Sequence, residues 1–414
     1  MHPHDRHLSR SVAVIGGGIG GLTAALSLLK AGFDVHVYEQ THSLRDVGAG
    51  IQISPNASRI LSRLGLTGAS AMRGVTPLAL RQRRWDDGFT LRSTPLGTAV
   101  ERACGSPYYQ VHRADLLDAL TELLPAGRLH TGYRLTDLTE NDDRILARFD
   151  NGRSIEAAAL IAADGIHSTV RRMMFGGESA RFTGCVAYRG LVGAERLASL
   201  ELPLESQIWM GPGRHFVHYF VRDATLINFV AIIERDSWTR ESWTAQAPLS
   251  EVLKEFEGWH PQTRAILQAA DEVFIWGLFE HAPLPQWSAG RVTVLGDACH
   301  AMLPFLAQGA AQAIEDGATL TRCLMKSAGR DIPGALRAYE SLRLPRASRV
   351  QAASQDNRQR FHLPDGPQQR ARDAQIRDAS TDWFLQAMDW VYGHDAGAVE
   401  AGDYACPSEV SSEV

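Results

Sequence analysis

The sequence of 414 residues has few cysteines, very few lysines and no long apolar run. Its five scattered cysteines form no CxxC pair, which argues against a disulfide framework or a zinc ribbon and suits a reducing compartment. The formal net charge is −5, so no basic excess indicates a nucleic-acid or acidic-membrane partner. The polar N-terminus lacks the plan of a signal peptide, and no stretch approaches the roughly 20 apolar residues of a membrane span. We expect a soluble, cytoplasmic monomer or homodimer without nucleic-acid or membrane partners.

A strand–turn–helix–strand pattern occupies residues 11–39. Residues 12–15 are a β-branched run typical of a buried parallel strand, and residues 16–21 match G-x-G-x-x-G. In such a unit the glycines allow a tight turn, close approach of a pyrophosphate and helix–strand packing, while the helix N-terminus faces the phosphates. The alternative, a flexible glycine loop, would not explain why the second strand ends in the acidic residue Glu39. The pattern predicts dinucleotide binding, without separating FAD from NAD, by Gly16, Gly18, Gly20, Gly21, Glu39 and the adjacent Gln40.

Two later segments narrow the choice of cofactor. One is Ala-Asp-Gly-Ile-His-Ser-Thr-Val-Arg at 163–171, and the other is Gly-Asp-Ala-Cys-His at 296–300. In this order after a G-x-G-x-x-G motif, they resemble the class A flavoprotein aromatic monooxygenases, over about residues 11–395. The resemblance implies bound FAD, with Asp297 at the ribityl chain and Asp164 near the pyrophosphate and the nicotinamide path. It also implies that four further residues lie at the FAD site. Arg113 would lie near the phosphates, and Arg45 and Gln52 would lie in the loop beside the isoalloxazine. The fourth residue is Leu135.

A helix is predicted to follow Gln308, with Gly309 and Ala310 at its start. Its free N–H groups would favour the anionic reduced flavin. We interpret Glu315 and Asp316 in its second turn as solvated or capping rather than catalytic. Cys299-His300 is interpreted as packing near the flavin rather than as a nucleophile or metal pair, and no metal site is predicted.

No second G-x-G-x-x-G motif follows, so NADH or NADPH is expected to bind transiently, without a domain of its own. The resemblance implies hydride transfer to FAD, addition of O₂ to give a C4a-hydroperoxide, and oxygen transfer to an activated aromatic ring. The protein would exclude water and help to deprotonate a substrate hydroxyl.

Candidates for this deprotonation lie on the strand predicted at residues 214–221. His215 and Tyr219 share one face at period two, as a base and a hydroxyl could; the alternative is two polar residues on a half-exposed strand. The 6-hydroxynicotinate 3-monooxygenases carry a similar His and Tyr, but have His where this chain has Gln52 and Phe305. Arg189 is a candidate for a substrate carboxylate, although a structural ion pair is the favoured alternative. Pro304 and Phe305 are further substrate-site candidates.

We predict an α/β fold with a Rossmann-like FAD-binding domain of the glutathione-reductase type, an inserted antiparallel β-sheet substrate domain and a helical C-terminal region. The expected FAD-binding parts are 11–75, 109–178 and 286–330, and the substrate parts are 76–108 and 179–285. Helices at 331–395 and a disordered tail at 396–414 complete the division.

The predicted function is hydroxylation of a small phenolic or hydroxy-N-heteroaromatic carboxylate, of the salicylate, hydroxybenzoate or hydroxynicotinate type. The alternatives are the same machinery on a larger, polycyclic substrate, by epoxidation or inactivation, and a dinucleotide-binding protein without turnover. A plain NAD dehydrogenase is disfavoured by the Asp-Gly and Gly-Asp segments.

Overall fold

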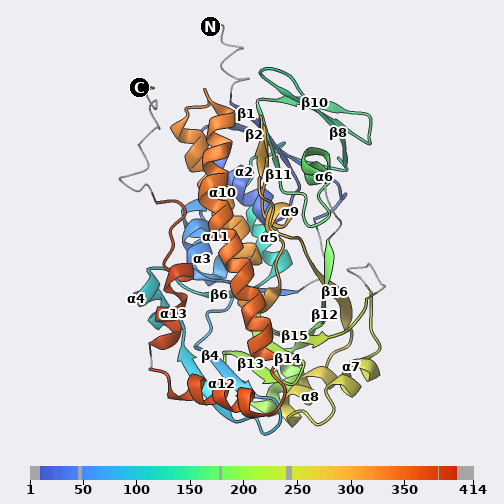
Figure 1. The fold of residues 1–414 in the computed structure, drawn as a ribbon, viewed down its shortest axis with the longest axis vertical. Coiled ribbons are helices and arrows are strands. Elements are labelled where there is room, and N and C mark those ends of the chain that lie inside the picture. The colour runs from blue at the N-terminus through green and yellow to red at the C-terminus, as the bar shows by residue number, and fades with distance from the viewer. Residues whose placement is uncertain (1–9, 45–48, 177–179, 239–244, 381, 399–414) are drawn as a thin grey trace, which may run out of the picture.

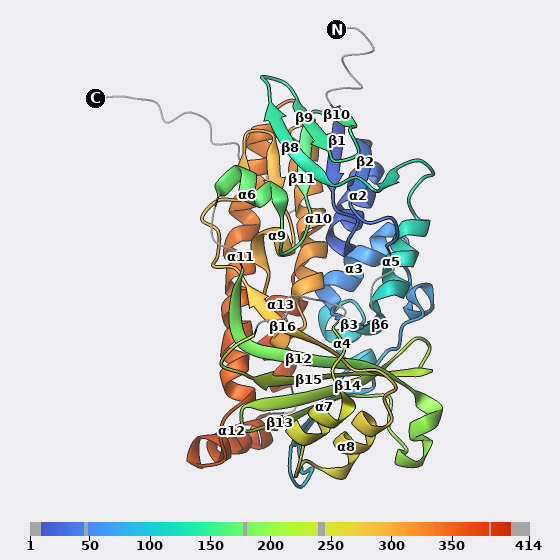
Figure 2. The same cartoon turned by 90° about the vertical axis from the view of Figure 1, so that its right-hand side faces the viewer.

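The computed structural model describes residues 10–44, 49–176, 180–238, 245–380 and 382–398. Two sheets lie toward opposite ends of the molecule, and a long helix runs between them (Figures 1 and 2). Expectations for residues 1–9, for Arg45 and for residues 399–414 fall outside the described residues. Within the described ranges, no helix combines the length and the apolar character needed to cross a membrane.

The first sheet has six strands and contains the predicted strand–turn–helix–strand unit. Strand β1 pairs in parallel with β2 on one side and with β11 on the other, and its last four residues are buried on both faces. Its strand order is β17 (Ser288–Ala289), β18 (Val292–Val294), β11 (Ala159–Ala162), β1 (Ser11–Ile15), β2 (Asp34–Glu39) and β7 (Leu129–Thr131). Only the β17–β18 pairing is antiparallel.

Helices and a small sheet complete this half of the molecule. Its principal helices are α2 (Ile19–Lys30), α3 (Pro55–Leu64), α5 (Arg113–Glu122), α6 (Thr169–Phe175), α9 (Asp297–His300) and α10 (Gly309–Lys326). The antiparallel sheet of β8 (Leu135–Glu140), β9 (Ile145–Phe149) and β10 (Ser154–Ala157) packs into the same core. Residues 154–163 read as one strand in the sequence. The chain instead leaves β10 after Ala157 and enters the central sheet at Ala159.

The second sheet has seven strands, in the order β16 (Phe274–Glu280), β12 (Arg181–Gly193), β15 (Leu226–Glu234), β14 (Arg214–Val221), β13 (Ser206–Gly211), β4 (Ala79–Arg84) and β5 (Thr90–Pro95). The sheet is antiparallel, as predicted, except at one pairing, where β13 and β4 run parallel. Helices α7 (Leu249–Glu255) and α8 (Pro261–Gln268) cover one face (Figure 2). The other face is turned toward the six-stranded sheet.

The C-terminal helices are α11 (Ile332–Phe361), α12 (Pro367–Asp378) and α13 (Trp383–Tyr392), as the sequence predicted in outline. Helix α11 extends along the molecule from the six-stranded to the seven-stranded sheet (Figure 1). Near its start, Tyr339 donates to the carbonyl of Val294, and near its end, Ser354 donates to the carbonyl of Leu303. The packed chain also continues beyond the boundary expected at 395, because Ala396 is buried. The division into domains remains a prediction.

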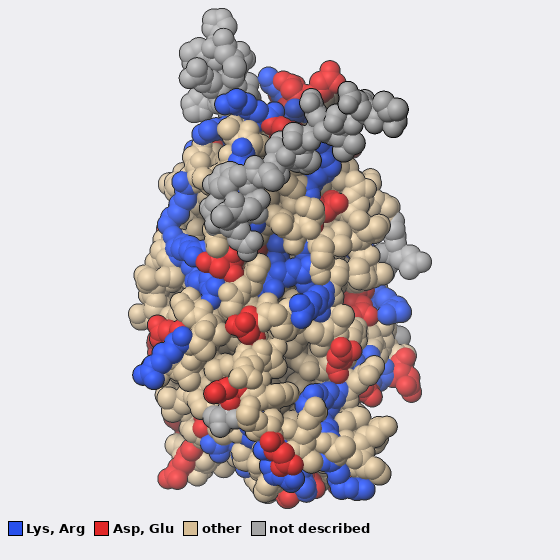
Figure 3. All heavy atoms as spheres, turned by 60° about the vertical axis from the view of Figure 1, so that its left-hand side comes forward, with Lys and Arg blue, Asp and Glu red and all other residues tan. Residues whose placement is uncertain are grey.

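The remaining elements are short and lie outside the two large sheets. Strands β3 and β6 pair antiparallel between them. These elements are β3 (Gly50–Ile53), β6 (Tyr109–His112), α4 (Gly97–Cys104) and the short 3₁₀ turns η1 (Ala69–Met72), η2 (Ala194–Leu200) and η3 (Pro304–Leu306). On the face shown in Figure 3, basic and acidic side chains are interspersed rather than gathered into a field of one sign.

Candidate active site

In the glycine turn between β1 and α2, Gly16, Gly20 and Gly21 are closed to side chains, whereas Gly18 is open. Gly16 has φ +106°, and a Cβ there would lie 2.3 Å from the carbonyl oxygen of Ala163. A Cβ on Gly20 would meet a leucine side chain at 2.7 Å, and one on Gly21 would meet the Gly16 carbonyl oxygen at 2.0 Å. A Cβ on Gly18 would meet nothing within 4 Å. The first three are therefore explained by packing, whereas Gly18 leaves open backbone where a pyrophosphate could approach.

Glu39 ends β2 and holds this turn. Its Oε2 accepts a hydrogen bond from the backbone N–H of Gly17 at 2.7 Å, and its Oε1 accepts two from Thr41. A carboxylate has about four acceptor positions, so one remains for a ribose hydroxyl. Gln40 is exposed, and the side chain of Leu135 is buried in the core. Leu135 could therefore reach a cofactor only through its backbone.

Asp164, Asp297 and Arg113 are the polar candidates for the cofactor site outside the glycine turn. Asp164 caps α6 through Oδ2, while its Oδ1 is buried without a hydrogen-bond partner among the described residues. Burial raises the pKa of this carboxyl. Asp297 is exposed, although the three residues after it are buried. Burial lowers the pKa of Arg113, and the nearby charge of Asp297 opposes this effect. The orphaned oxygen and the open glycines fit a dinucleotide cofactor.

The start of α10 is also open. A Cβ on Gly309 would meet no atom within 4 Å, and Ala310 follows it in the first turn. Gln308 is buried before the helix, donating to Ser54 Oγ at 2.9 Å and accepting from Asn56 Nδ2 at 3.1 Å. These bonds hold the position of the helix start, whose N–H groups could face an anionic group.

The interpretation of Glu315 and Asp316 as solvated or capping was wrong. Both side chains are fully buried, and Arg343 of α11 pairs with both. Glu315 also pairs with Arg346 and accepts from Asn56 Nδ2 at 2.6 Å. Burial alone would raise their pKa values, but the surrounding positive charges lower both to about 2.

Asp316 anchors the segment that carries Asp297. Its Oδ2 accepts from the backbone N–H of Gly296 at 3.0 Å and lies 2.6 Å from Nε2 of His300. Cys299 is buried beside them. Cys299 and His300 are thus buried within this segment, with the histidine bonded to Asp316, and their packing near the flavin remains a prediction. The sequence contains one signal for the burial of Glu315 and Asp316, because the predicted helix has apolar residues on several sides.

His215 and Tyr219 are both buried, on the face of β14 opposite that of Phe216, which packs in one core with residues of α7 and α8. The ring of His215 lies 4.9 Å from that of Phe305 in η3, which begins at Pro304. Tyr219 packs against the start of β3, because a Cβ on Gly50 would lie 2.8 Å from its ring. Four residues of strand separate the two by about 13 Å at Cα, so they do not contact each other, and Val217 lies between them on the same face. The half-exposed alternative is wrong.

Arg189 enters the same region from β12. Its guanidinium lies 4.5 Å from the centre of the Trp276 ring, and its buried Nε has no hydrogen-bond partner. No carboxylate in the described part of the chain pairs with it, so the described residues do not support the favoured ion-pair interpretation. Burial lowers its pKa to about 10; the nearby Tyr219 opposes this shift and Arg113 adds to it. Arg189 could therefore bind an anion that the described residues do not supply.

Gln52 is bound within the chain. Its Oε1 accepts from the hydroxyl of Tyr108 at 2.5 Å, and its Nε2 donates to Ser206 Oγ at 3.3 Å. The sequence reasoning missed His362, whose Nε2 lies 2.7 Å from Nδ1 of His215. The two histidines are 147 residues apart, and no local pattern indicates the contact.

Comparisons with known proteins agree with this arrangement. Residues 9–354 match the family model of the FAD binding domain. The chain is 44% identical to the 3-amino-4-hydroxybenzoate 2-monooxygenase PtmB3 of Streptomyces platensis, over 95% of this chain and 99% of that protein. It is 40% identical to the 6-hydroxynicotinate 3-monooxygenase of Bordetella bronchiseptica, over 84% and 91%. The solved structure of Klebsiella pneumoniae HpxO complexed with FAD and uric acid has a TM-score of 0.82 at 27% identity, over 91% of this chain and 95% of that one.

Proposed function

The chain belongs to the class A FAD-dependent aromatic monooxygenases, and from this premise we propose that it hydroxylates a small phenolic or hydroxy-N-heteroaromatic carboxylate, with NADH or NADPH as transient reductant and O₂ as the oxygen source. The observation that carries the substrate class is Arg189, a half-buried arginine whose Nε is buried without a hydrogen-bond partner and which has no carboxylate partner among the described residues. An aromatic carboxylate would supply the missing charge.

The residues around the glycine turn would hold FAD. In this proposal the open backbone at Gly18 receives the pyrophosphate, Glu39 the ribose and Asp297 the ribityl chain. Arg113 and Asp164 lie near the phosphates. When bound, FAD would supply the redox chemistry by which a reduced nicotinamide and O₂ together yield an oxygen atom for the ring. The start of α10, at Gly309, favours negative charge on the neighbouring part of the cofactor.

The chain's own side chains bind the substrate and move its proton. Arg189 binds the carboxylate, and Trp276 beneath it shields the pair from water. His215 accepts the proton of the ring hydroxyl, because no described residue forms a hydrogen bond with its Nε2. Phe305 packs against His215 and excludes water from this proton. Tyr219 lies at the other end of the same strand face, where it can contact the ring from the opposite side.

The test is turnover by the purified, FAD-loaded protein. We expect a yellow protein whose NADH or NADPH oxidation is stimulated by at least one of 3-amino-4-hydroxybenzoate, 6-hydroxynicotinate, salicylate and 3-hydroxybenzoate. Mass spectrometry after reaction under ¹⁸O₂ should show one labelled oxygen in the product. Stimulated oxidation that yields only hydrogen peroxide with all four acids, or no stimulation, would contradict the proposal.

A further inference from the structure

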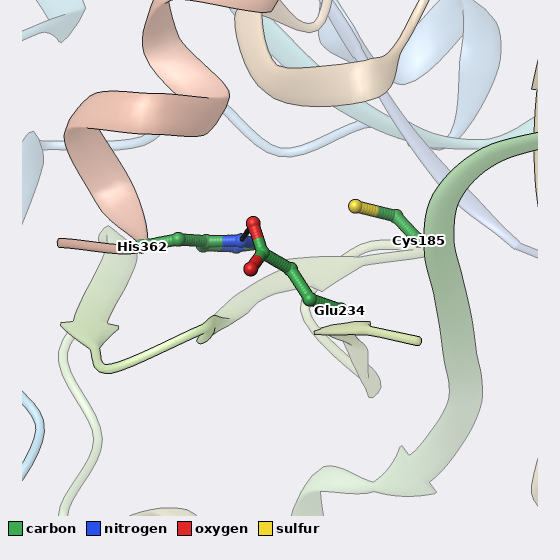
Figure 4. A group of neighbouring side chains, drawn as sticks. All are labelled: Cys185, Glu234 and His362. Carbon is green, nitrogen blue, oxygen red and sulfur yellow. Dashed lines mark hydrogen bonds and ion pairs between the residues drawn. The ribbon is translucent and has the colours of Figure 1, made fainter. Parts of the chain in front are cut away.

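A chain of three titratable side chains leads from His215 to the protein surface. Nδ1 of His215 lies 2.7 Å from Nε2 of His362, at the end of α11. Nδ1 of His362 in turn lies 3.1 Å from Oε1 of Glu234, at the end of β15 (Figure 4). His215 is 2% exposed, whereas the Glu234 side chain is 42% exposed. The chain thus connects a buried imidazole to solvent.

The direction of each hydrogen bond follows from the carboxylate at the outer end. An ionised carboxylate only accepts, so Nδ1 of His362 carries a hydrogen and donates to Glu234. A neutral His362 then has a lone pair on Nε2, which accepts from Nδ1–H of His215. The remaining nitrogen of a neutral His215, Nε2, is therefore an unprotonated acceptor. This arrangement leaves a base at the inner end of the chain.

We propose that His215, His362 and Glu234 form a proton relay that carries the proton of the substrate hydroxyl from the active site to solvent. The relay rests on the proposed function, since it needs a substrate with an acidic ring hydroxyl. The O–H bond of the substrate breaks, and its proton binds Nε2 of His215. The Nδ1 proton of His215 passes to Nε2 of His362, and the Nδ1 proton of His362 passes to Glu234 and then to water. One proton leaves, and the substrate remains as its anion.

The electrostatics of the three groups agree with passage rather than storage of a proton. Burial lowers the pKa of His215 well below its usual value, and the neighbouring His362 lowers it further. Burial also lowers the pKa of His362, which the hydrogen bond to Glu234 only partly opposes. Conversely, that bond is the main reason why the pKa of Glu234 is lowered. Neither imidazole retains a positive charge, so the transfers are coupled.

The charged and titratable groups around the relay come from several elements. Arg358 of α11 lies 3.4 Å from Oε1 of Glu234, and Arg214 of β14 lies close enough to lower the pKa of His362. Cys185 of β12 approaches from the other side (Figure 4). These arginines disfavour a cation inside the relay and so assist the outward movement of the proton.

The same neighbourhood resembles a metal site, because one ligand atom each of Cys185, Glu234 and His362 lies within 4.8 Å of the others. One observation disfavours a metal. The guanidinium of Arg358 already lies beside the carboxylate oxygen that a cation would need.

The test measures deprotonation without turnover. FAD-loaded protein is mixed in a stopped-flow instrument with 4-hydroxy-3-nitrobenzoate, whose phenolate absorbs visible light, at a pH where the free phenol is protonated. Wild type should ionise the bound phenol rapidly. Glu234→Gln and His362→Gln should bind it with an unchanged dissociation constant but ionise it at least about tenfold more slowly. Both variants should retain FAD.

A second arm separates a relay from a structural role. Because Glu234 is exposed, formate or azide should restore the ionisation rate of Glu234→Ala in a concentration-dependent way. Glu255→Gln is the matched control, because Glu255 pairs with Arg214 but does not contact His362. It should ionise the probe like wild type. A structural defect would not be corrected by a small base.

The outcomes distinguish the relay from the proposed function. Wild-type ionisation rates in Glu234→Gln and His362→Gln would overturn the relay while leaving His215 as the base. A wild type that binds the probe without ionising it would overturn both the relay and the role of His215. Failure of wild type to bind this probe and all four aromatic acids would contradict the proposed function itself.

Discussion

The carboxylate of Asp316 accepts a hydrogen bond from the backbone N–H of Gly296 over 3.0 Å, and thereby ties helix α10 to the segment that carries Asp297. Arg343 of α11 pairs with the same aspartate at 2.7 Å. One buried carboxylate thus links three segments that are separate in sequence. The stability of the fold and the geometry of the FAD site depend on the same charge.

We expect Asp316→Asn to lower the free energy of unfolding by about 3 kcal/mol, because it leaves the buried Arg343 with an incomplete set of partners. It should also weaken FAD binding, since the Gly296 segment loses its anchor. Urea denaturation and FAD titration measure the two effects. Asp378→Asn, which disrupts an exposed pair with Arg377, is the control and should behave like wild type. If the Asp316→Asn and Asp378→Asn variants had equal free energies of unfolding, Asp316 would not anchor the Gly296 segment.

Stability should fall in acid through Glu315 and Asp316. The pKa values of both are about 2 in the folded protein, below the ordinary values of 4.5 and 3.8. A depressed folded pKa stabilises the protein above the unfolded value, and this contribution is lost as pH falls from about 4.5 toward about 2. Urea denaturation over this pH range should therefore show a steep decline. The decline should be shallower in Glu315→Gln, and an unchanged slope would refute the assignment.

Two alanine substitutions in the glycine turn should have different effects. Gly16→Ala places a Cβ 2.3 Å from the Ala163 carbonyl oxygen at a positive φ, so we expect poor folding. Gly18→Ala meets no protein atom within 4 Å, so it should fold normally but bind FAD at least about tenfold more weakly. Thermal melting followed by circular dichroism, together with the FAD content, tests the pair. Full FAD affinity in Gly18→Ala would show that this backbone does not approach the cofactor.

Arg189→Met tests carboxylate recognition. The variant should bind 3-amino-4-hydroxybenzoate about 10- to 100-fold more weakly, while its affinity for 2-aminophenol, which lacks the carboxylate, stays unchanged. Its stability should stay close to that of wild type, because the half-buried Arg189 forms no ion pair with the described residues. Arg83→Met is the control, since Arg83 also stacks on a tryptophan, 4.1 Å from the Trp209 ring, but lies away from the proposed site. If Arg189→Met still favours 3-amino-4-hydroxybenzoate over 2-aminophenol by the same ratio of affinities as wild type, another group binds the carboxylate.

Local patterns predicted those parts of the site that are contiguous in sequence. The glycines of residues 16–21 and Glu39 belong to one strand–turn–helix–strand unit, so their spacing alone indicates their arrangement. The placement of His215 and Tyr219 on one face of β14 likewise follows from the period of two of a strand, although their burial does not. These predictions needed only backbone geometry.

Contacts between distant segments could not be predicted in this way. Glu315 and Asp316 have the appearance of surface residues until Arg343 is brought to them by the packing of α11 on α10. His362 reaches His215 only because α11 ends beside β14. The parallel pairing of β13 with β4 depends on a strand that precedes it by more than 100 residues. Each of these depends on how whole elements pack together.

Helix α11 has 30 residues and so spans about 45 Å. Arg343, in its first half, neutralises the carboxylates behind the FAD site, and His362 at its end contacts His215 beneath the proposed substrate. A chimaera that joins the six-stranded sheet of one relative to the seven-stranded sheet of another would match this helix at only one of its ends. The two sheets are therefore expected to be inherited together with α11, and gene recombination between relatives should succeed only when all three come from one parent.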